Sequence, residues 1–323
     1  MNILIKCIFL FREWIESKNS RGVDFQYCEG EHVSISELKE DPRIDQHYLR
    51  KAYIPYYPKS IFQVSKVCHV TGESGLWSIF NDGGFRKPQF LDDSLLWWSL
   101  SVTKDDIADA EQNILRKMFP AGHAENQQPF LEDFTASPAF QNKSRYGNFR
   151  FTFSLKELLR LYAEQYCRES ALVLRVLDTA IYSQEILYTV LVHPQHVNCY
   201  DQYPRLPSDD SGVCGYSQGK MSWRCQSPSD SFRHRMEVDR EERRVHARPL
   251  QSEVYYRWDH VAVAFHVEPD WILHVDRKKL SSSVSVCEVA EINLLKEPDT
   301  PLSESDARAV LKNVRRQYRL GPV

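Results

Sequence analysis

The chain has 323 residues, of which 42% are apolar, and this composition excludes a wholly disordered protein. Its 41 basic and 44 acidic residues give a formal net charge of −3, so no overall field attracts nucleic acid or an anionic membrane surface. The chain is long enough to bury one sizeable core, and any charged partner must be recognised locally.

The cysteines and the N-terminal residues indicate in which cellular compartment we expect the protein. The eight cysteines have no close pairs and no repeated spacing, which predicts free thiols in a reducing compartment, the cytoplasm first and the nucleus second. The apolar start of the chain is interrupted by Lys6 and lacks a small-residue cleavage site, so we expect a packed amphipathic element and not a secretory signal. No later stretch approaches the roughly 18 apolar residues that a membrane span needs.

The first predicted unit is an N-terminal extension over residues 1–58. It is rich in polar residues, Pro42 interrupts any long helix, and it ends in an extended aromatic run over 53–58. A single α+β domain is predicted to follow over 59–295. It begins with a strand over 60–70, a short helix over 73–80 and a glycine-rich turn over 81–84.

Two amphipathic helices are predicted from their N-terminal caps. Thr103 with Asp106 resembles a capping box and follows a strand over 95–102, which predicts a helix over 103–118. Ser154 with Glu157 resembles a second box and predicts a helix over 154–166, after a strand over 148–153. We expect both helices to cover one sheet.

The rest of the domain contains three further predicted strands, over 171–178, 181–192 and 254–267. Between the last two, residues 201–250 lack apolar periodicity and are rich in Pro, Ser, Asp, Gly and Arg, which predicts an insertion loop. Its mixed charges favour a solvated segment over a nucleic-acid patch. The C-terminal unit, 300–323, should form a helix over 303–318 packed outside the domain.

These elements predict an α+β fold with a split, largely antiparallel sheet, short helices and a C-terminal helix. The most informative segment runs from Cys68 to Pro88. It has a strand that ends in His69-Val70-Thr71, a short helix and then Gly84-Phe85. This segment resembles the first motif of ADP-ribosyltransferases of the poly(ADP-ribose) polymerase type, in which a His-Gly-Thr or His-Gly-Ser sequence precedes a helix and a Gly-Phe turn. The resemblance is loose over the rest of the chain.

The resemblance implies an ADP-ribosyltransferase-like fold that binds NAD as a substrate. His69, Val70 and Thr71 would then contact the ribose and the carboxamide. Val70 stands where the family has glycine, and its branched side chain would crowd the nicotinamide. Without the resemblance, a core histidine bonded to a loop carbonyl is the simpler interpretation of His69.

The family also has a catalytic glutamate on a later strand, and two residues match that pattern. Glu185 lies among Ile, Leu, Tyr and Val, 116 residues after His69, and is the first candidate. Glu253 is the second. For Glu185 the alternative is an outward-facing strand glutamate.

The family's aromatic residue that stacks on nicotinamide has no clear match here. Trp98 and Tyr146 are the candidates to supply an aromatic face. His193, His196 and Cys199 offer ligand types for zinc, but no Cys-x-x-Cys pair accompanies them, so no metal site is predicted.

The resemblance therefore implies an NAD-dependent transferase that adds a single ADP-ribose to a protein acceptor. The alternative is a non-catalytic protein-interaction module that presents the 201–250 segment to a partner protein. A role of that module in innate immunity is implied only by a whole-chain resemblance to fish proteins. Neither hypothesis predicts a nucleic-acid or membrane partner.

Overall fold

A computed structural model of the chain describes residues 12–19, 22–44, 60–87, 95–134, 138–140, 143–144, 146–182, 185–208, 212–225, 231–255, 258–289 and 301–319. These residues form a mixed α/β fold with mostly antiparallel sheets, short helices and a C-terminal helix, as the sequence predicts at that level. The predicted N-terminal amphipathic element and the aromatic run over 53–58 lie outside the described residues.

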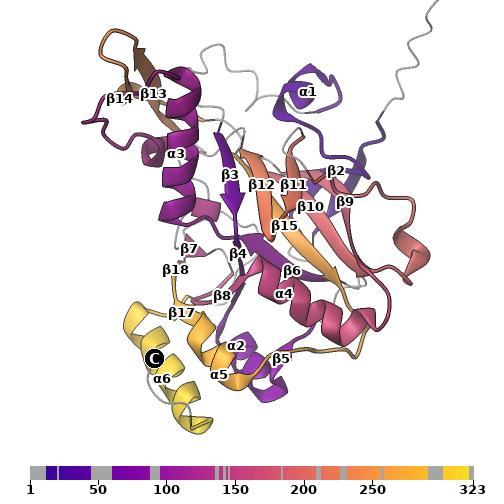
Figure 1. Ribbon diagram of the computed structural model, residues 1–323. Coiled ribbons are helices and arrows are strands. Elements are labelled where there is room, and N and C mark those ends of the chain that lie inside the picture. Colours follow the sequence, from indigo (N-terminus) through magenta and orange to yellow (C-terminus); the bar gives the residue numbers. More distant parts are fainter. Residues whose placement is uncertain are drawn as a thin grey trace, which may run out of the picture.

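The largest sheet among the described residues has nine strands, and we call it the main sheet (Figure 1). Its neighbouring strands are antiparallel except for the central pair β10·β15, which is parallel. In spatial order the strands are β1 (Ile15–Lys18), β2 (Asp24–Glu29), β9 (Leu172–Ile181), β10 (Glu185–Pro194), β15 (Trp258–His266), β6 (Leu95–Leu100), β4 (Lys66–Thr71), β8 (Phe149–Ser154) and β17 (Val284–Val286).

Smaller sheets surround the main sheet. Strands next to each other in sequence, such as β3 and β4, can belong to different sheets. The small sheets are β11 (Cys214–Ser217) with β12 (Lys220–Cys225) and β3 (Ser60–Val64); β13 (Ser231–Asp239) with β14 (Arg244–Tyr255); β16 (Leu273–His274) with β5 (Gly84–Phe85); and β18 (Glu288–Val289) with β7 (Lys143–Ser144).

The described helices are α1 (Ile35–Glu40), α2 (Glu73–Asp82), α3 (Lys104–Met118), α4 (Leu155–Tyr162), α5 (Arg277–Ser283) and α6 (Glu304–Gln317). Among them, α2, α3, α4 and α6 lie close to predicted positions, whereas α1 and α5 were not predicted. The capping box of α3 is confirmed, since the Thr103 hydroxyl accepts from the Asp106 backbone N–H and the Asp106 carboxylate accepts from the Thr103 N–H. α4 continues as a π-helical turn, Ala163–Cys167.

The predicted capping box of α4 does not form. Ser154 occupies the N-cap position, but its side chain makes no capping hydrogen bond. Ser154 is also the last residue of β8, where it pairs with Lys66, so the strand fixes its backbone. The helix is held instead by its apolar face, on which Leu155, Leu158 and Tyr162 are fully buried.

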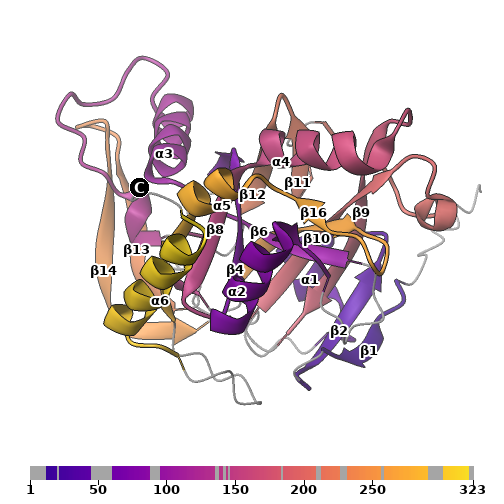
Figure 2. The ribbon, with the colours of Figure 1, turned by 90° about the horizontal axis from the view of Figure 1, so that it is seen from below.

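The C-terminal helix packs beside α2 and α5, as Figure 2 shows from below. The Tyr318 ring stacks on Phe80 with centroids 5.7 Å apart, and the Arg277 guanidinium lies 5.1 Å from the Tyr318 centroid. The apolar face of α6, with Ala307, Leu311 and Val314 buried, belongs to the same hydrophobic core as α2.

Two predicted units differ from the structure. The described part of 1–58 is no separate extension, because β1 and β2 add two strands to the main sheet. Phe25 and Tyr27 alternate with Asp24 and Gln26, and this short period-two pattern is the signal that the sequence analysis missed.

The predicted loop over 201–250 contains strands β11, β12, β13 and most of β14. Gln218 and Gly219 both have positive φ, as a two-residue hairpin turn requires, and they join β11 to β12. In β13 the charges alternate with Met236 and Val238, so one strand face is charged and the other is apolar. The prediction of a loop was wrong, because charged and apolar residues alternate in β13 with the period of a strand.

In the part of the chain that the structure describes, seven cysteines are free thiols. None of the helices described there is long and apolar enough to cross a bilayer.

Candidate functional site

His69 lies on β4 and is held by one hydrogen bond and two aromatic rings. Its Nδ1 is 2.9 Å from the carbonyl oxygen of Trp97, and its ring centroid is 5.3 Å from that of Phe85 and 5.4 Å from that of Trp98. A carbonyl only accepts, so Nδ1 carries the proton and Nε2 is a hydrogen-bond acceptor in the neutral ring. Burial lowers the pKa of His69, and the bond to Trp97 opposes this in part.

This environment contains the segments that carry the sequence resemblance. Gly84-Phe85 forms β5 and brings Phe85 against His69, and β6 brings Trp98. No residue that the structure describes bonds to Nε2 of His69. The bond to the Trp97 carbonyl also matches the simpler interpretation of His69 as a core residue.

Trp98 is a buried support for the His69 ring and not an exposed aromatic surface. Only 1% of it is exposed, and its ring also contacts Phe85 and Phe153. Its indole N–H is buried without a hydrogen-bond partner among the described residues. Its contribution is therefore apolar packing.

Two glycines approach Thr71 closely at the end of β4, and one of them, Gly147, follows Tyr146 in the chain. A Cβ on Gly75 would lie 1.8 Å from Oγ1 of Thr71, so α2 approaches this side chain closely. Gly147 has φ +141°, and a Cβ there would lie 2.3 Å from the Thr71 carbonyl oxygen. Tyr146, next to Gly147, is 46% exposed.

Glu185 begins β10 and makes a different contact. It is 9% exposed, and its Oε1 lies 3.1 Å from Nε2 of His260 on β15. Burial, followed by the charges of Glu185 and Tyr146, raises the pKa of Tyr182.

The strand register places Glu185 and His69 on opposite faces of the main sheet. Side chains that stand directly opposite in neighbouring strands share a face. From β4, the face of His69 continues through Trp98 of β6 and Val263 of β15 to Val190 of β10. Glu185 is five residues before Val190, an odd number, so its side chain lies on the other face.

The two strands are also separated laterally. β6 and β15 lie between β4 and β10, so three strand spacings of about 4.8 Å put the strands about 14 Å apart. The structure does not bring His69 and Glu185 together. Glu253 lies on β14, in a hairpin outside the main sheet, and its side chain is not described. Val70 is half-buried on the face opposite His69, where it pairs with Arg150.

Sequence reasoning missed two polar clusters that only the fold assembles. In the first, the Cys214 thiol lies 3.4 Å from Nδ1 of His32, whose Nε2 lies 3.0 Å from the Thr189 carbonyl oxygen. Nε2 therefore carries the proton and Nδ1 accepts from the thiol, which is the orientation of a nucleophile and its base. Burial raises the pKa of the Cys214 thiol and lowers that of His32 to about 4, so both groups are neutral at pH 7. A buried neutral thiol is a structural group.

The second cluster surrounds His193 at the end of β10. Arg175 Nε donates to Nε2 of His193 at 2.9 Å, and its two terminal nitrogens bind the Tyr203 carbonyl and Asp201. Tyr200 bonds to Nδ1 of His266 at 2.8 Å. No group of three or more His, Cys, Asp or Glu side chains within the described ranges is arranged to hold a metal ion. His196, which the sequence places three residues after His193, bonds to Ser170 instead, so the spacing of the two histidines gave no signal for this cluster.

Comparisons with protein-family models, with curated proteins and with solved structures find no significant match to this chain.

Proposed function

We propose that this protein is an ADP-ribosyltransferase-like protein that binds NAD at the His69 end of β4 and does not use Glu185 to transfer ADP-ribose. The observation that carries the binding proposal is the state of His69. Its Nδ1 proton is committed to the Trp97 carbonyl, its ring is fixed by Phe85 and Trp98, and its Nε2 remains an acceptor. An acceptor held in this way suits a ribose hydroxyl.

Thr71 supports the same site, because it is two residues after His69 on β4 and its side chain therefore lies on the same face. Tyr146 is 46% exposed and precedes Gly147, which lies against Thr71, so we propose its ring as the one on which nicotinamide or adenine stacks. The proposal that transfer does not use Glu185 rests on the position of that residue, which is paired with His260 on the opposite face. Electrostatic stabilisation of a reacting ribose requires the carboxylate next to it.

Calorimetric titration of NAD into the full chain tests the binding proposal. His69→Ala should weaken binding at least about tenfold, since it removes a charge-free hydrogen bond and a ring contact. His260→Gln, on the opposite face, is the matched control and should leave the affinity unchanged. Thermal unfolding of each variant establishes that it is folded. Absence of binding to the unmodified protein would refute the proposal.

Release of nicotinamide from NAD tests the catalytic half. We expect Glu185→Gln to leave any release unchanged. If the unmodified protein releases nicotinamide and Glu185→Gln lowers the rate about a hundredfold or more, as loss of an electrostatic stabiliser does, the carboxylate takes part in transfer and this half of the proposal is wrong.

A further inference from the structure

The β13–β14 hairpin has two different faces. Met236 and Val245 on its inner face are 5% and 1% exposed and belong to the core, and the His234 ring lies 6.3 Å from the Phe134 ring of the 3-10 turn Leu131–Phe134. On the outer face, Glu237 lies between two arginines, 2.5 Å from Arg235 and 2.7 Å from Arg248. The hairpin is therefore docked by one apolar face and exposes a charged one.

The two edges of the hairpin also differ. Gln127 covers the edge of β14, where its side chain accepts from the Val245 N–H at 2.9 Å and donates to the Val245 carbonyl at 2.8 Å. The backbone N–H of Ala124 bonds to the Arg243 carbonyl next to it. On β13, no described residue pairs with the outer edge of the His234–Asp239 stretch. A two-stranded sheet with an unpaired edge of this length is open to strand addition.

The charges of Arg235 and Glu237 along β13 are complementary to those of a second copy of the same strand. Its outer face carries Arg235 and Glu237 on either side of Met236, so the signs reverse about that residue. In an antiparallel pair of identical strands centred on Met236, Arg235 of each strand stands opposite Glu237 of the other. A strand whose charges had one sign would repel its own copy, but this strand complements it.

We propose that the β13 edge is a self-association surface. The β13 strands of two copies pair antiparallel across a two-fold axis at Met236 and join two hairpins into one four-stranded sheet. The same register sets position 233, an arginine, opposite position 239, an aspartate. The proposal does not depend on NAD binding.

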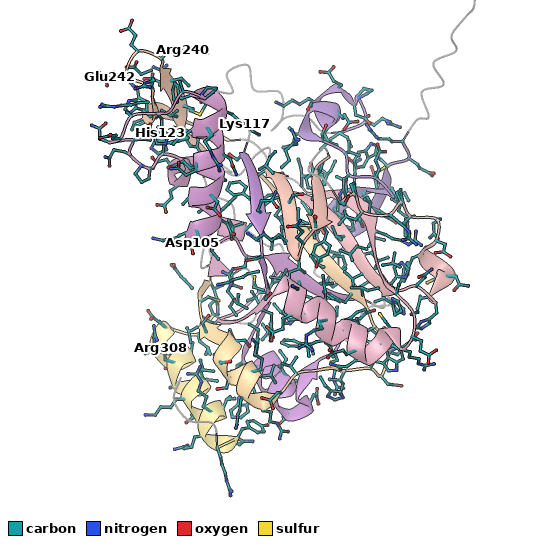
Figure 3. All side chains as sticks on the ribbon, in the orientation of Figure 1. Asp105, Lys117, His123, Arg240, Glu242 and Arg308 are labelled. Atoms are coloured by element: carbon teal, nitrogen blue, oxygen red, sulfur yellow. The ribbon has the colours of Figure 1, made fainter. Side chains whose placement is uncertain are left out.

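The position of the hairpin is consistent with this partner. Figure 3 shows Arg240 and Glu242 at the hairpin tip, at the outer end of the molecule beside His123 and Lys117. A strand at an outer end can meet a second copy without displacing the core. The β1 edge of the main sheet is only four residues long, so it offers fewer backbone hydrogen bonds to a second copy.

Charge reversal and mixing test the proposal, with sedimentation velocity as the measurement. The unmodified chain should dimerise as its concentration rises. Arg235→Glu alone and Glu237→Arg alone each create two like-charge pairs across the axis and should weaken the dimer at least about tenfold. An equimolar mixture of the two variants restores opposite signs at both pairs and should dimerise.

The mixture separates pairing between chains from damage within a chain. A hairpin that had unfolded in one variant would not recover on mixing, and circular dichroism checks the fold of each variant separately. Arg248→Glu breaks the ion pair to Glu237 on the far strand and Lys18→Glu alters the β1 edge, so both serve as controls that should still dimerise. A monomeric unmodified chain, single variants that dimerise normally, or a mixture that stays monomeric would each overturn the proposal.

Discussion

His69 and His193 are two neutral histidines on strands of the same sheet, and they are held in different ways. Each directs Nδ1 at a backbone carbonyl 2.9 Å away, that of Trp97 for His69 and that of Pro194 for His193. Around His69 the remaining contacts are aromatic. Around His193 a guanidinium donates to Nε2, and that guanidinium is itself bound to a carboxylate and a carbonyl.

The difference shows which forces keep a buried imidazole neutral. At His69 burial dominates the lowered pKa. At His193 burial is again the largest cause of the lowered pKa; the bond to the Pro194 carbonyl opposes it, and the positive charge of Arg175 adds to it. The first region should therefore respond most to loss of apolar area and the second to loss of a cation. The Nε2 of His69, which has no partner among the described residues, can accept a hydrogen bond from a ligand, whereas the Nε2 of His193 is already bonded to Arg175.

Trp98→Ala should have the largest effect on stability. It removes a fully buried indole that contacts His69, Phe85 and Phe153, and deletion of such a ring lowers the free energy of unfolding by about 3–5 kcal/mol. Trp98→Phe is the matched control. It keeps most of the area and removes an indole N–H that has no partner among the described residues, so it should lower stability by about 1–2 kcal/mol. Urea unfolding measures the free energy of unfolding of both variants. If Trp98→Phe lowered it as much as Trp98→Ala, the indole N–H and not the buried ring area would account for the loss.

Arg175→Met tests the charged region. It leaves the acceptor Nε2 of His193 and the Tyr203 carbonyl without a donor, which should lower the free energy of unfolding by about 2–3 kcal/mol. Asp201→Asn is the control, because the Asp201 side chain is 60% exposed and its ion pair to Arg175 should contribute less than about 1 kcal/mol. If Asp201→Asn were as damaging as Arg175→Met, the carboxylate and not His193 would be the main partner of the guanidinium.

The pH dependence of stability should be dominated by histidines that the fold holds neutral. His32 resembles His69, since its ring packs on Tyr188 and its Nε2 bonds to the Thr189 carbonyl. Burial lowers its pKa from 6.5 to about 4, so its contribution to stability is complete above pH 6.5 and is lost as the pH falls toward 4. Between pH 7 and pH 5 the loss should be about 2 kcal/mol from this group.

His32→Gln keeps a donor for the Thr189 carbonyl and cannot be protonated. The drop in unfolding free energy from pH 7 to pH 5 should therefore be smaller in this variant than in the unmodified chain, by about 2 kcal/mol. His246→Gln, at an exposed position on β14, controls for the loss of an imidazole. An unchanged drop in His32→Gln would mean that His32 takes up its proton equally in the folded and unfolded chain.

Local chemistry made much of the fold predictable from the sequence. The α3 box of Thr103 and Asp106 was predicted and forms, and the apolar face of α4 fixed that helix even though its predicted cap does not form. Two predictions were wrong for different reasons. Ser154 ends strand β8 as well as preceding α4, so its side chain does not cap the helix. The charged residues of β13 form one face of a strand and not a loop.

The candidate site was less predictable because it depends on strand order. The surroundings of His69 follow from nearby sequence, with Phe85 16 residues away and Trp98 29 residues away. The separation of Glu185 from His69 depends on the order of the strands, since β6 and β15 lie between β4 and β10. The face of Glu185 depends on the register of β10, in which Glu185 is an odd number of residues from Val190. A shift of one residue would reverse the face, and no pattern within β10 specifies it.

The smallest predicted effect concerns the tyrosines that line the His193 region. Tyr200 bonds to Nδ1 of His266 at 2.8 Å and lies between the His193 and His266 rings, with centroids 5.2 and 5.3 Å away. Tyr200→Phe keeps the ring and removes this partly buried bond, so it should lower the free energy of unfolding by about 1 kcal/mol. Tyr203→Phe is the control, since its hydroxyl bonds at 3.3 Å to Glu29 in an exposed position and should contribute almost nothing. Chemical denaturation resolves this difference if both variants unfold with the same denaturant dependence. Equal losses would mean that ring packing, and not the bond to His266, holds this region, which would make it more like the surroundings of His69.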